Sequence, residues 1–251
     1  MNASKDFFEL IKSIGESKSK QEEDRIIQSE TRVLKTMLAS PLPTGPGGAR
    51  RIREVLVRLI YVEMLGHDAS WGYVVAIQQT ASLDLAQKRA GYLACCLMLA
   101  PEHDFRFMLV NQMQRDLGSA NILEINAALV ALCKLVTLDM IPPMITKVAS
   151  LLTHEQSMVR QKSAMALHRF HQLDAGAVAH LSPQITALLR DREPSVMGAA
   201  LCILHDMARA DPSSQSELVD HYVSILKQIT EHRLVSSHAA RLSMNQFNRR
   251  K

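Results

Sequence analysis

The sequence predicts an all-α protein, built as a curved solenoid of stacked helix pairs. Ala90, Ala127, Ala164 and Leu201 recur at intervals of 37 residues, and each has an apolar residue five positions before it and another three positions after it. The composition is 47% hydrophobic but only 4% aromatic, which favours helices over strands. Because one helix pair cannot bury its apolar face alone, this period predicts an α-α superhelix of the HEAT or armadillo type, with about five helical pairs. The flanking residues are Leu85, Ile122, Val159 and Val196 before the recurring position, and Leu93, Val130, Leu167 and Leu204 after it.

Residues 1–39 are expected to form opening helices. Phe7, Ile11 and Ile14 have helical spacing, and a second amphipathic stretch over residues 26–38 follows the acidic run at residues 22–24. Acidic residues at a helix start interact favourably with the positive end of the helix dipole. We therefore expect the helical stretches of this segment to precede the repeats.

A loop or linker is expected over residues 40–49, SPLPTGPGGA, where three prolines and three glycines exclude a helix. The segment is rich in glycine, but it lacks the following Lys and Ser or Thr that would hold phosphate and magnesium. It therefore separates the opening helices from the solenoid, which we expect over residues 50–234.

Helix starts and stops can be placed along the solenoid. A helix from about Arg51 to Leu65 should end at Gly66, and the next should begin at Trp71 with Asp68 or Ser70 as its cap. Further breaks leave room for about two helices per repeat, an outer one and an inner one joined by a short turn. These breaks fall at Pro101, Gly118, Pro142 with Pro143, residues 174–176, Pro194 and Pro212.

The charge is unevenly distributed along the chain. The formal net charge is +4, but residues 232–251 hold five basic residues and no acidic one, so the solenoid is close to neutral. This balance does not favour a nucleic-acid partner, which usually requires a basic face. The amino terminus is too short and too polar for a signal peptide, and no stretch is apolar over the length that spans a membrane. We expect a cytoplasmic protein.

The four cysteines lack the two-residue gap typical of metal knuckles. Cys96 and Cys133 share one phase of the 37-residue register with Phe170 and Met207. This phase predicts that both are buried, reduced thiols, which are typical of a reducing compartment.

No arrangement of nucleophile and base is present, so we expect neither an enzyme nor a cofactor. His168 and His171 lie one helical turn apart, but no Asp, Glu or Cys joins them at ligand spacing, so no metal site is predicted. Basic residues recur near the predicted turns beside acidic ones, and we expect them to solvate the surface. These are Lys88, Arg89, Arg160, Lys162, Arg190 and Arg192.

One basic cluster lies near the amino terminus. Lys12, Lys18 and Lys20 form a candidate patch for lipid or cargo, in which each charge close to an anionic membrane contributes about 1 kcal/mol. Neighbouring acidic residues at 22–24 dilute it. We therefore expect at most an auxiliary, peripheral membrane contact.

The stretch VRLIYVEMLGHDASWGY, residues 57–73, resembles the signature of the adaptin large subunits of clathrin-type adaptor complexes. Three later blocks resemble successive adaptin segments in the right order: KRAGYLA at 88–94, RDL at 115–117 and VRQKSAMALHRFH at 159–171. Within the family, the sequence of these blocks is most similar to the epsilon class of the fourth adaptor complex. The signature residues are Tyr61, Met64, Leu65, Gly66, Trp71 and Gly72.

This resemblance implies a non-enzymatic trunk segment that cradles a sigma-type small subunit and packs beside a beta-type large subunit, with a medium subunit completing the complex. It implies vesicle coat assembly and cargo sorting at the trans-Golgi network. It also implies contact with an activated Arf-type GTPase through Val74, Ile77 and Met108. Ile77 shares the repeat register with Leu151 and Leu188, so burial is an alternative for this residue.

Two positions depart from the family pattern. The arginine with which related adaptins help to read dileucine sorting signals falls on Gly15, so recognition in that manner is not expected. Residues 235–251 resemble none of the family's continuation, and we expect an unrelated, disordered basic tail on a truncated trunk. The alternative to an adaptor subunit is a free-standing repeat protein that acts as an interaction scaffold outside any vesicle coat.

Overall fold

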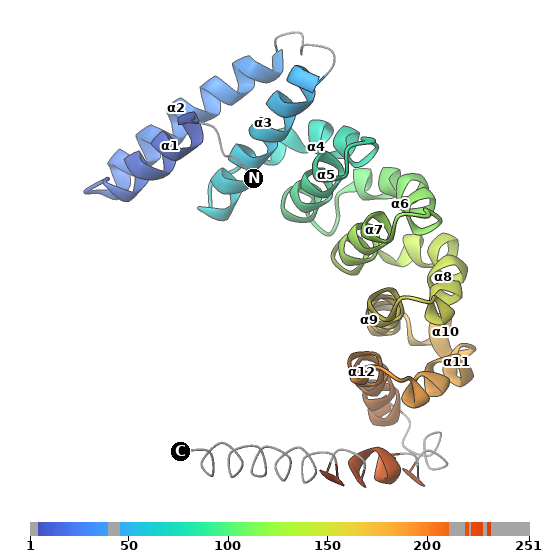
Figure 1. Cartoon of the computed structure of the whole chain (residues 1–251). Helices are drawn as coiled ribbons and strands as arrows, with labels where there is room; N and C mark the ends of the chain where they lie inside the picture. The colour runs from blue at the N-terminus through green and yellow to red at the C-terminus, as the bar shows by residue number, and fades with distance from the viewer. Residues whose placement is uncertain (1–4, 40–45, 211–218, 221, 228–229, 232–251) are drawn as a thin grey trace, which may run out of the picture.

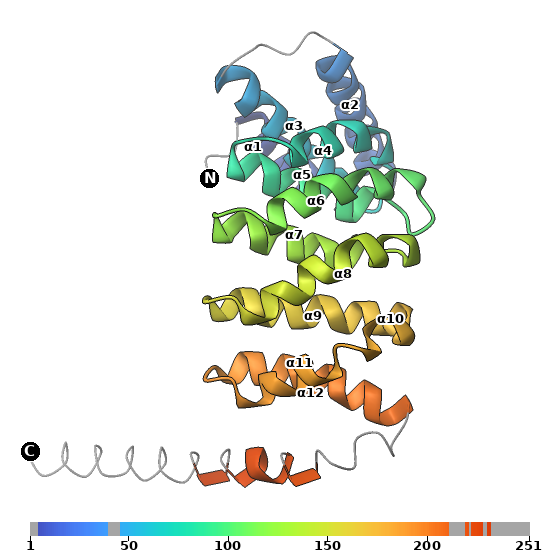
Figure 2. The same ribbon diagram turned by 90° about the vertical axis from the view of Figure 1, so that its right-hand side faces the viewer.

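The computed structural model describes residues 5–39, 46–210, 219–220, 222–227 and 230–231. Within these ranges every regular element is a helix and no strand is present, which confirms the predicted fold class. The helices form a curved arc in which α4, α6, α8, α10 and α11 lie on the outside and α5, α7, α9 and α12 on the inside (Figure 1). Seen from the outer side, the pairs stack as successive layers (Figure 2).

The opening helices are α1 (Lys5–Gly15), α2 (Lys20–Ala39) and α3 (Pro46–Met64). The outer elements are η1 (Ser70–Gly72) with α4 (Tyr73–Thr80), η2 (Asp104–Leu109) with α6 (Val110–Leu117), η3 (Leu138–Met140) with α8 (Ile141–Ser150) and η4 (Leu151–Thr153), and α10 (Ala175–Ala179) with α11 (Ser182–Ala187) and η5 (Leu188–Arg190). The inner helices are α5 (Leu85–Met98), α7 (Ile122–Leu135), α9 (Ser157–Leu173) and α12 (Pro194–Ala210).

The segment predicted as a linker is partly helical. Helix α3 begins at Pro46 and so includes the last four residues of the range 40–49. Proline fits the first turn of a helix, because its missing N–H would have no intrahelical acceptor there. The prediction that proline and glycine exclude helix is therefore wrong for residues 46–49, and residues 40–45 lie outside the described ranges.

The inner helices show the true period of the solenoid. They begin at Leu85, Ile122, Ser157 and Pro194, so the intervals are 37, 35 and 37 residues. The strict 37-residue register is therefore wrong between α7 and α9, where the connecting segment is two residues shorter than the one before it.

The two-residue slip changes which side chains are buried. Leu93 and Val130, expected in the core, are exposed, whereas Leu167 and Leu204 are fully buried. Cys96 and Cys133 are likewise only half-buried, while Phe170 in the same predicted phase is fully buried. Burial is still sufficient to raise the pKa of the Cys96 thiol to about 11, and all four cysteines are free.

Each inner helix carries a small residue at the same position. The seventh residue of every inner helix is small: Gly91, Ala128, Ser163 and Ala200. The approach is closest at Gly91, where a Cβ would lie 2.8 Å from the carbonyl oxygen of Ala76 and 2.8 Å from the amide nitrogen of Thr80. A larger residue at this position would therefore push α4 away from α5.

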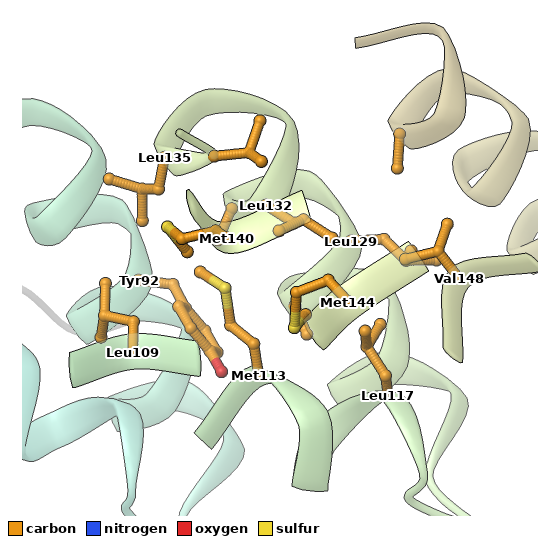
Figure 3. Packing of buried hydrophobic residues seen from close by; sticks show 14 of the residues in the cluster. Tyr92, Leu109, Met113, Leu117, Leu129, Leu132, Leu135, Met140, Met144 and Val148 are labelled. Carbon is orange, nitrogen blue, oxygen red and sulfur yellow. The ribbon is translucent and has the colours of Figure 1, made fainter. Parts of the chain in front are cut away.

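One continuous core runs through the arc. Figure 3 shows its centre, where Met113 and Leu117 from α6 pack among Leu129 and Leu132 from α7 and Met144 from α8. Each of these side chains is almost completely buried. Among the described residues no helix is both long enough and apolar enough to cross a membrane. Pro212 and the predicted tail at 235–251 lie outside the described residues.

Candidate functional site

The signature residues build the turn that follows α3. Gly66 has a φ of 83°, a left-handed conformation that glycine adopts without strain. The amide of Gly66 donates to the Glu63 carbonyl at 2.9 Å, and the amide of His67 donates to the Val62 carbonyl at 3.2 Å. This pair of bonds is a Schellman motif, which satisfies the last carbonyls of the helix. The predicted stop at Gly66 is confirmed.

Other signature residues hold neighbouring elements in place. The Tyr61 ring meets Phe7 of α1 edge to face, with ring centroids 5.5 Å apart. A Cβ on Gly72 would lie 2.7 Å from Cδ1 of Leu59, so η1 packs tightly on α3. The Lys35 ammonium lies 5.0 Å from the centre of the Trp71 ring. The signature therefore has a clear structural role, although the Met64 side chain is exposed.

The predicted cap of the next helix has a different form. The Asp68 carboxylate accepts from the Ser70 amide at 2.9 Å. Hydrogen bonding from the Ser70 side chain, and then from its amide, lowers the pKa of Asp68. The Glu63 carboxylate accepts from the Ala69 amide at 2.8 Å. Helix α4 begins at Tyr73 without a side-chain cap. The 3-10 turn η1 precedes it, and the Ser70 carbonyl in η1 accepts a hydrogen bond from the Tyr73 amide.

Two of the three predicted GTPase-contact residues lie exposed on the outer side of the arc. Val74 on α4 is 48% exposed and Met108 on η2 is 59% exposed. The Tyr73 ring stacks on Phe105 at a centroid distance of 5.2 Å, which places the start of α4 beside η2. Ile77 is instead half-buried against the core, in agreement with the alternative reading of its register.

The outer surface holds more apolar side chains than the sequence suggested. Phe105 and Phe107, also on η2, are exposed. We call Val74, Phe105, Phe107 and Met108 the outer apolar patch. In DFRFM, polar and apolar residues alternate over the first four positions, a strand-type pattern too short to predict an element, so only its concentration of aromatic residues could have indicated an exposed surface.

The lysines of the amino-terminal cluster are largely paired with acidic residues. Lys12 lies 3.8 Å from Glu16. Lys20 lies 3.0 Å from Glu23 and 3.7 Å from Asp24, and the hydrogen bond that Lys20 donates to Glu23 raises the pKa of Lys20. Lys18 lies in the turn between α1 and α2. The three lysines thus belong to a mixed-charge surface, in which the nearby acids offset much of their charge.

The structure places a carboxylate beside His168, a contact that the local sequence could not show. Nε2 of His168 lies 2.6 Å from Oδ2 of Asp206, which comes from the next inner helix. This contact lowers the pKa of Asp206, and burial lowers the pKa of His171. Across the described residues, no group of three or more His, Cys, Asp or Glu side chains is arranged to hold a metal.

Two cations expected to solvate the surface instead tie successive repeats together. Lys88 is almost fully buried and donates to Asp116 at 2.6 Å, while the Tyr92 hydroxyl donates to the other oxygen of Asp116 at 2.6 Å. Burial lowers the pKa of Lys88, but bonds to Asp116 and Glu124 outweigh it and the net pKa is raised. The prediction of a solvated Lys88 is therefore wrong.

Arg160 makes a corresponding ion pair between repeats further along the arc. Its guanidinium donates to both carboxylate oxygens of Asp191, at 2.7 and 2.8 Å, and to the carbonyl of His154 at 2.7 Å. The hydrogen bonds from Arg160 lower the pKa of Asp191. Fork-shaped pairing of this kind fixes orientation as well as distance, so it sets the angle between neighbouring repeats.

Known proteins similar to the chain agree with this architecture. The family model described as "Adaptin N terminal region" matches residues 23–248, which includes most of the segment expected to be an unrelated tail. The chain is 47% identical over 236 residues to the AP-4 complex subunit epsilon of Arabidopsis thaliana, and this match covers 94% of the chain and 25% of the relative. It is 36% identical over 220 residues to the human AP-4 complex subunit epsilon-1, covering 88% of the chain and 19% of the relative.

A structural comparison supports the same fold. A chain in a homology model of the full-length AP-3 complex, in an intermediate open conformation, matches with a TM-score of 0.62 and 22% identity. The match covers 71% of our chain and 32% of the other. At this identity the likeness shows the fold alone. The chain spans about a quarter or less of the length of the two curated relatives compared above. From its matched range and its repeat architecture, the chain belongs to the adaptin N-terminal region family.

Proposed function

We propose that the chain is the scaffold region of an epsilon-type large subunit in a heterotetrameric adaptor complex that acts in vesicle-mediated protein transport. The observation that carries this proposal is the 47% identity to the Arabidopsis AP-4 epsilon subunit over nearly the whole chain. The fold suits the role, because a stack of helix pairs presents an extended curved surface for partners. The chain itself acts without catalysis.

The partners in this proposal are a sigma-type small subunit, a beta-type large subunit and a medium subunit. The proposed site of action is the trans-Golgi network, where the complex lies peripherally on the membrane and sorts cargo. The mixed-charge surface around Lys12, Lys18 and Lys20 offers only a weak direct attraction to anionic lipid, because ion pairs occupy two of the three lysines. Recruitment therefore depends on a protein partner.

The proposed recruiting partner is an activated Arf-type GTPase, bound at the outer apolar patch. Val74 and Met108 supply exposed apolar area, and the neighbouring Phe107 enlarges it. Aromatic and methionine side chains are enriched at the cores of protein interfaces. Ile77 contributes little to such contact, because its side chain already packs against the core of the chain.

Affinity capture tests the proposal directly. The tagged chain is expressed in cells, captured, and the co-captured proteins are identified by mass spectrometry. Recovery of sigma-type, beta-type and medium subunits in similar amounts is the expected result. Capture of the chain with none of these subunits would contradict the proposal and would favour a free-standing scaffold.

A further inference from the structure

A serine preceded by two arginines lies at the turn into α12. Arg190 and Arg192 come five and three residues before Ser195, in the segment RDREPSV over residues 190–196. No other serine or threonine of the sequence has arginine at both of these distances. The arrangement is therefore particular to this turn and is not a by-product of frequent arginine.

The serine and both arginines are accessible. Ser195 is the second residue of α12, and Arg190 and residues 192–195 are all exposed to solvent. Among the described residues, the Ser195 hydroxyl has no hydrogen-bond partner. In the turn before α7, by contrast, the Ser119 hydroxyl donates to Glu124 at 2.6 Å. Ser195 is thus held neither by burial nor by a hydrogen bond of its side chain.

The turn that carries Ser195 lies at a side edge of the solenoid. Figure 2 shows the turns into α7, α9 and α12 at the left edge of the stack, beside the outer layer. The carboxylate of Asp191 fixes the start of the turn, because it accepts from the Glu193 amide at 2.9 Å and from Arg160 on α9 at 2.7 and 2.8 Å. The segment is therefore anchored at its start and open at the edge.

The first turn of α12 can open without loss of the core. To enter the active site of a kinase, a serine and the residues before it must become extended. The first four amides of a helix lack intrahelical acceptors, and helix ends fray. Here the Glu193 carbonyl accepts from the Val196 amide at 3.0 Å and from the Met197 amide at 3.3 Å. Because the Val196 side chain is fully buried, fraying reaches Ser195 while the rest of α12 stays in place.

We propose that Ser195 is a phosphorylation site for an arginine-directed serine/threonine kinase. Charge patterns in the substrate are one means by which kinases distinguish their targets. A kinase of this class carries acidic side chains in its substrate groove, and the planar guanidinium of arginine donates to both oxygens of a carboxylate. Arg192 and Arg190 supply the two cations on the same side of the serine.

The transfer uses a nucleoside triphosphate as co-substrate. Oγ of Ser195 attacks the γ-phosphorus, a new Oγ–P bond forms, and the bond from that phosphorus to the bridging oxygen breaks. The nucleoside diphosphate leaves with the electron pair, and the hydroxyl proton passes to a carboxylate of the kinase. No group of this chain other than the serine hydroxyl takes part in the chemical step.

The modification reverses the charge balance at the edge of the solenoid. Residues 190–195 hold two arginines and two acidic residues, so their net charge is zero. A phosphate adds about −1.5 to −2 at pH 7. Negative charge in the first turn of a helix is favourable, and the adjacent arginines are donors of the kind that bind phosphate. Phosphorylation therefore makes this edge anionic while α12 stays folded.

Other interpretations of the segment fit less well. A purely structural role is already filled by Arg160, which occupies the Asp191 carboxylate. A kinase that prefers acidic residues after the serine would favour Ser19, which precedes the acidic residues at 22–24. Ser157, the first residue of α9, is the natural comparison within the solenoid, because Leu152 and His154 occupy the two positions that hold arginine before Ser195.

Phosphorylation of the folded full chain tests the proposal. The chain is incubated with ATP, Mg²⁺ and a purified arginine-directed serine/threonine kinase, and the modified residues are mapped by mass spectrometry. A synthetic peptide of residues 187–199 serves as the positive control for the kinase, and an acid-directed kinase serves as the control enzyme. We expect the first enzyme to modify Ser195 in both the peptide and the folded chain, with Ser157 unmodified.

Arg192→Gln and Arg209→Gln form a matched pair of variants, because both arginines are exposed and they flank opposite ends of α12. We expect Arg192→Gln to lower the rate of Ser195 phosphorylation about tenfold, as for loss of one charge-assisted hydrogen bond to the kinase. Arg209→Gln should leave the rate unchanged, and Ser195→Ala should abolish the signal. Thermal melting of each variant, and of the phosphorylated chain, shows whether it is folded.

Three results would overturn the proposal: no modification of the folded chain, phosphate placed elsewhere with Ser195 unmodified, or equal rates for Arg192→Gln and Arg209→Gln. Modification of the peptide alone would show that the folded chain shields the serine, and would overturn the proposal as well. None of these outcomes depends on capture of adaptor subunits, so this proposal and the proposed function fail separately.

Discussion

Replacement of Gly91 by alanine should destabilise the protein by forcing α4 away from α5. The new Cβ would lie 2.8 Å from the Ala76 carbonyl oxygen, 2.8 Å from the Thr80 amide nitrogen and 2.9 Å from the Gln79 carbonyl carbon. All three are backbone atoms, so no side chain can rotate to make room. Overpacking of this kind costs about 1–3 kcal/mol. Alanine has a helix preference about 0.5–1 kcal/mol better than glycine, which leaves a net loss of roughly 0–2.5 kcal/mol.

Gly198→Ala is the matched control, because Gly198 lies on α12 and a Cβ there has no neighbour within 4 Å. This substitution should raise stability by up to about 1 kcal/mol through helix preference alone. Urea unfolding followed by circular dichroism measures both variants, and hydrogen exchange locates the effect in α4 and α5. If Gly91→Ala were as stabilising as Gly198→Ala, the close approach of α4 and α5 would be refuted.

Three further predictions follow from the buried pairs and the outer patch. Lys88→Met leaves the buried Asp116 carboxylate without its cation and should lower the free energy of unfolding by about 3 kcal/mol. Urea unfolding measures this change, and a loss below about 1 kcal/mol would contradict a stabilising role of the Lys88–Asp116 ion pair between repeats. Val74→Asp should reduce capture of the chain on a GTP-locked Arf-type GTPase by about tenfold, and capture equal to that of the unsubstituted chain would remove the patch from the recruiting surface. Because the Arg160 guanidinium lowers the pKa of Asp191 below its ordinary value of 3.8, this pair contributes stability at higher pH that is lost as pH falls through the lowered pKa. Thermal melting as pH falls through this lowered pKa should show a smaller loss of stability in Arg160→Gln than in the unsubstituted chain. An equal loss in both proteins would contradict the assignment of this effect to the Arg160–Asp191 pair.

Much of the fold could be predicted from the order of apolar residues and breaks. Gly66, Gly118 and Pro194 each mark an element boundary, as expected from their backbone chemistry. The register could not be assigned fully, because inner helices carry apolar residues on both their buried and exposed faces. Leu93 and Leu167 occupy equivalent positions in a strict 37-residue repeat, yet only Leu167 is buried.

The charged pairs between repeats could not be predicted from the sequence for a different reason. The partner of His168 is Asp206, 38 residues further along the chain, and only stacking of α9 on α12 brings them together. The partner of Lys88 likewise comes from the next repeat. Local spacing detects groups on one helix face, whereas these pairs depend on the rotation of one repeat relative to the next.

The outer patch was predicted in part. Val74 and Met108 were identified through the family resemblance and are exposed, but Ile77 is half-buried. Phe105 and Phe107 lie in η2, a 3-10 segment whose short turns do not follow the 3.6-residue pattern of the α-helix. Their exposure therefore became evident only from the structure.

Reconstitution with a sigma-type small subunit tests whether the chain is the scaffold of an adaptor complex. The chain is co-expressed with the small subunit of the Arabidopsis AP-4 complex, and the purified product is measured by size-exclusion chromatography with light scattering. We expect a single species whose mass equals one copy of each chain. Separate elution of the two chains, with each at its own mass, would contradict the assignment of this chain as an adaptor scaffold.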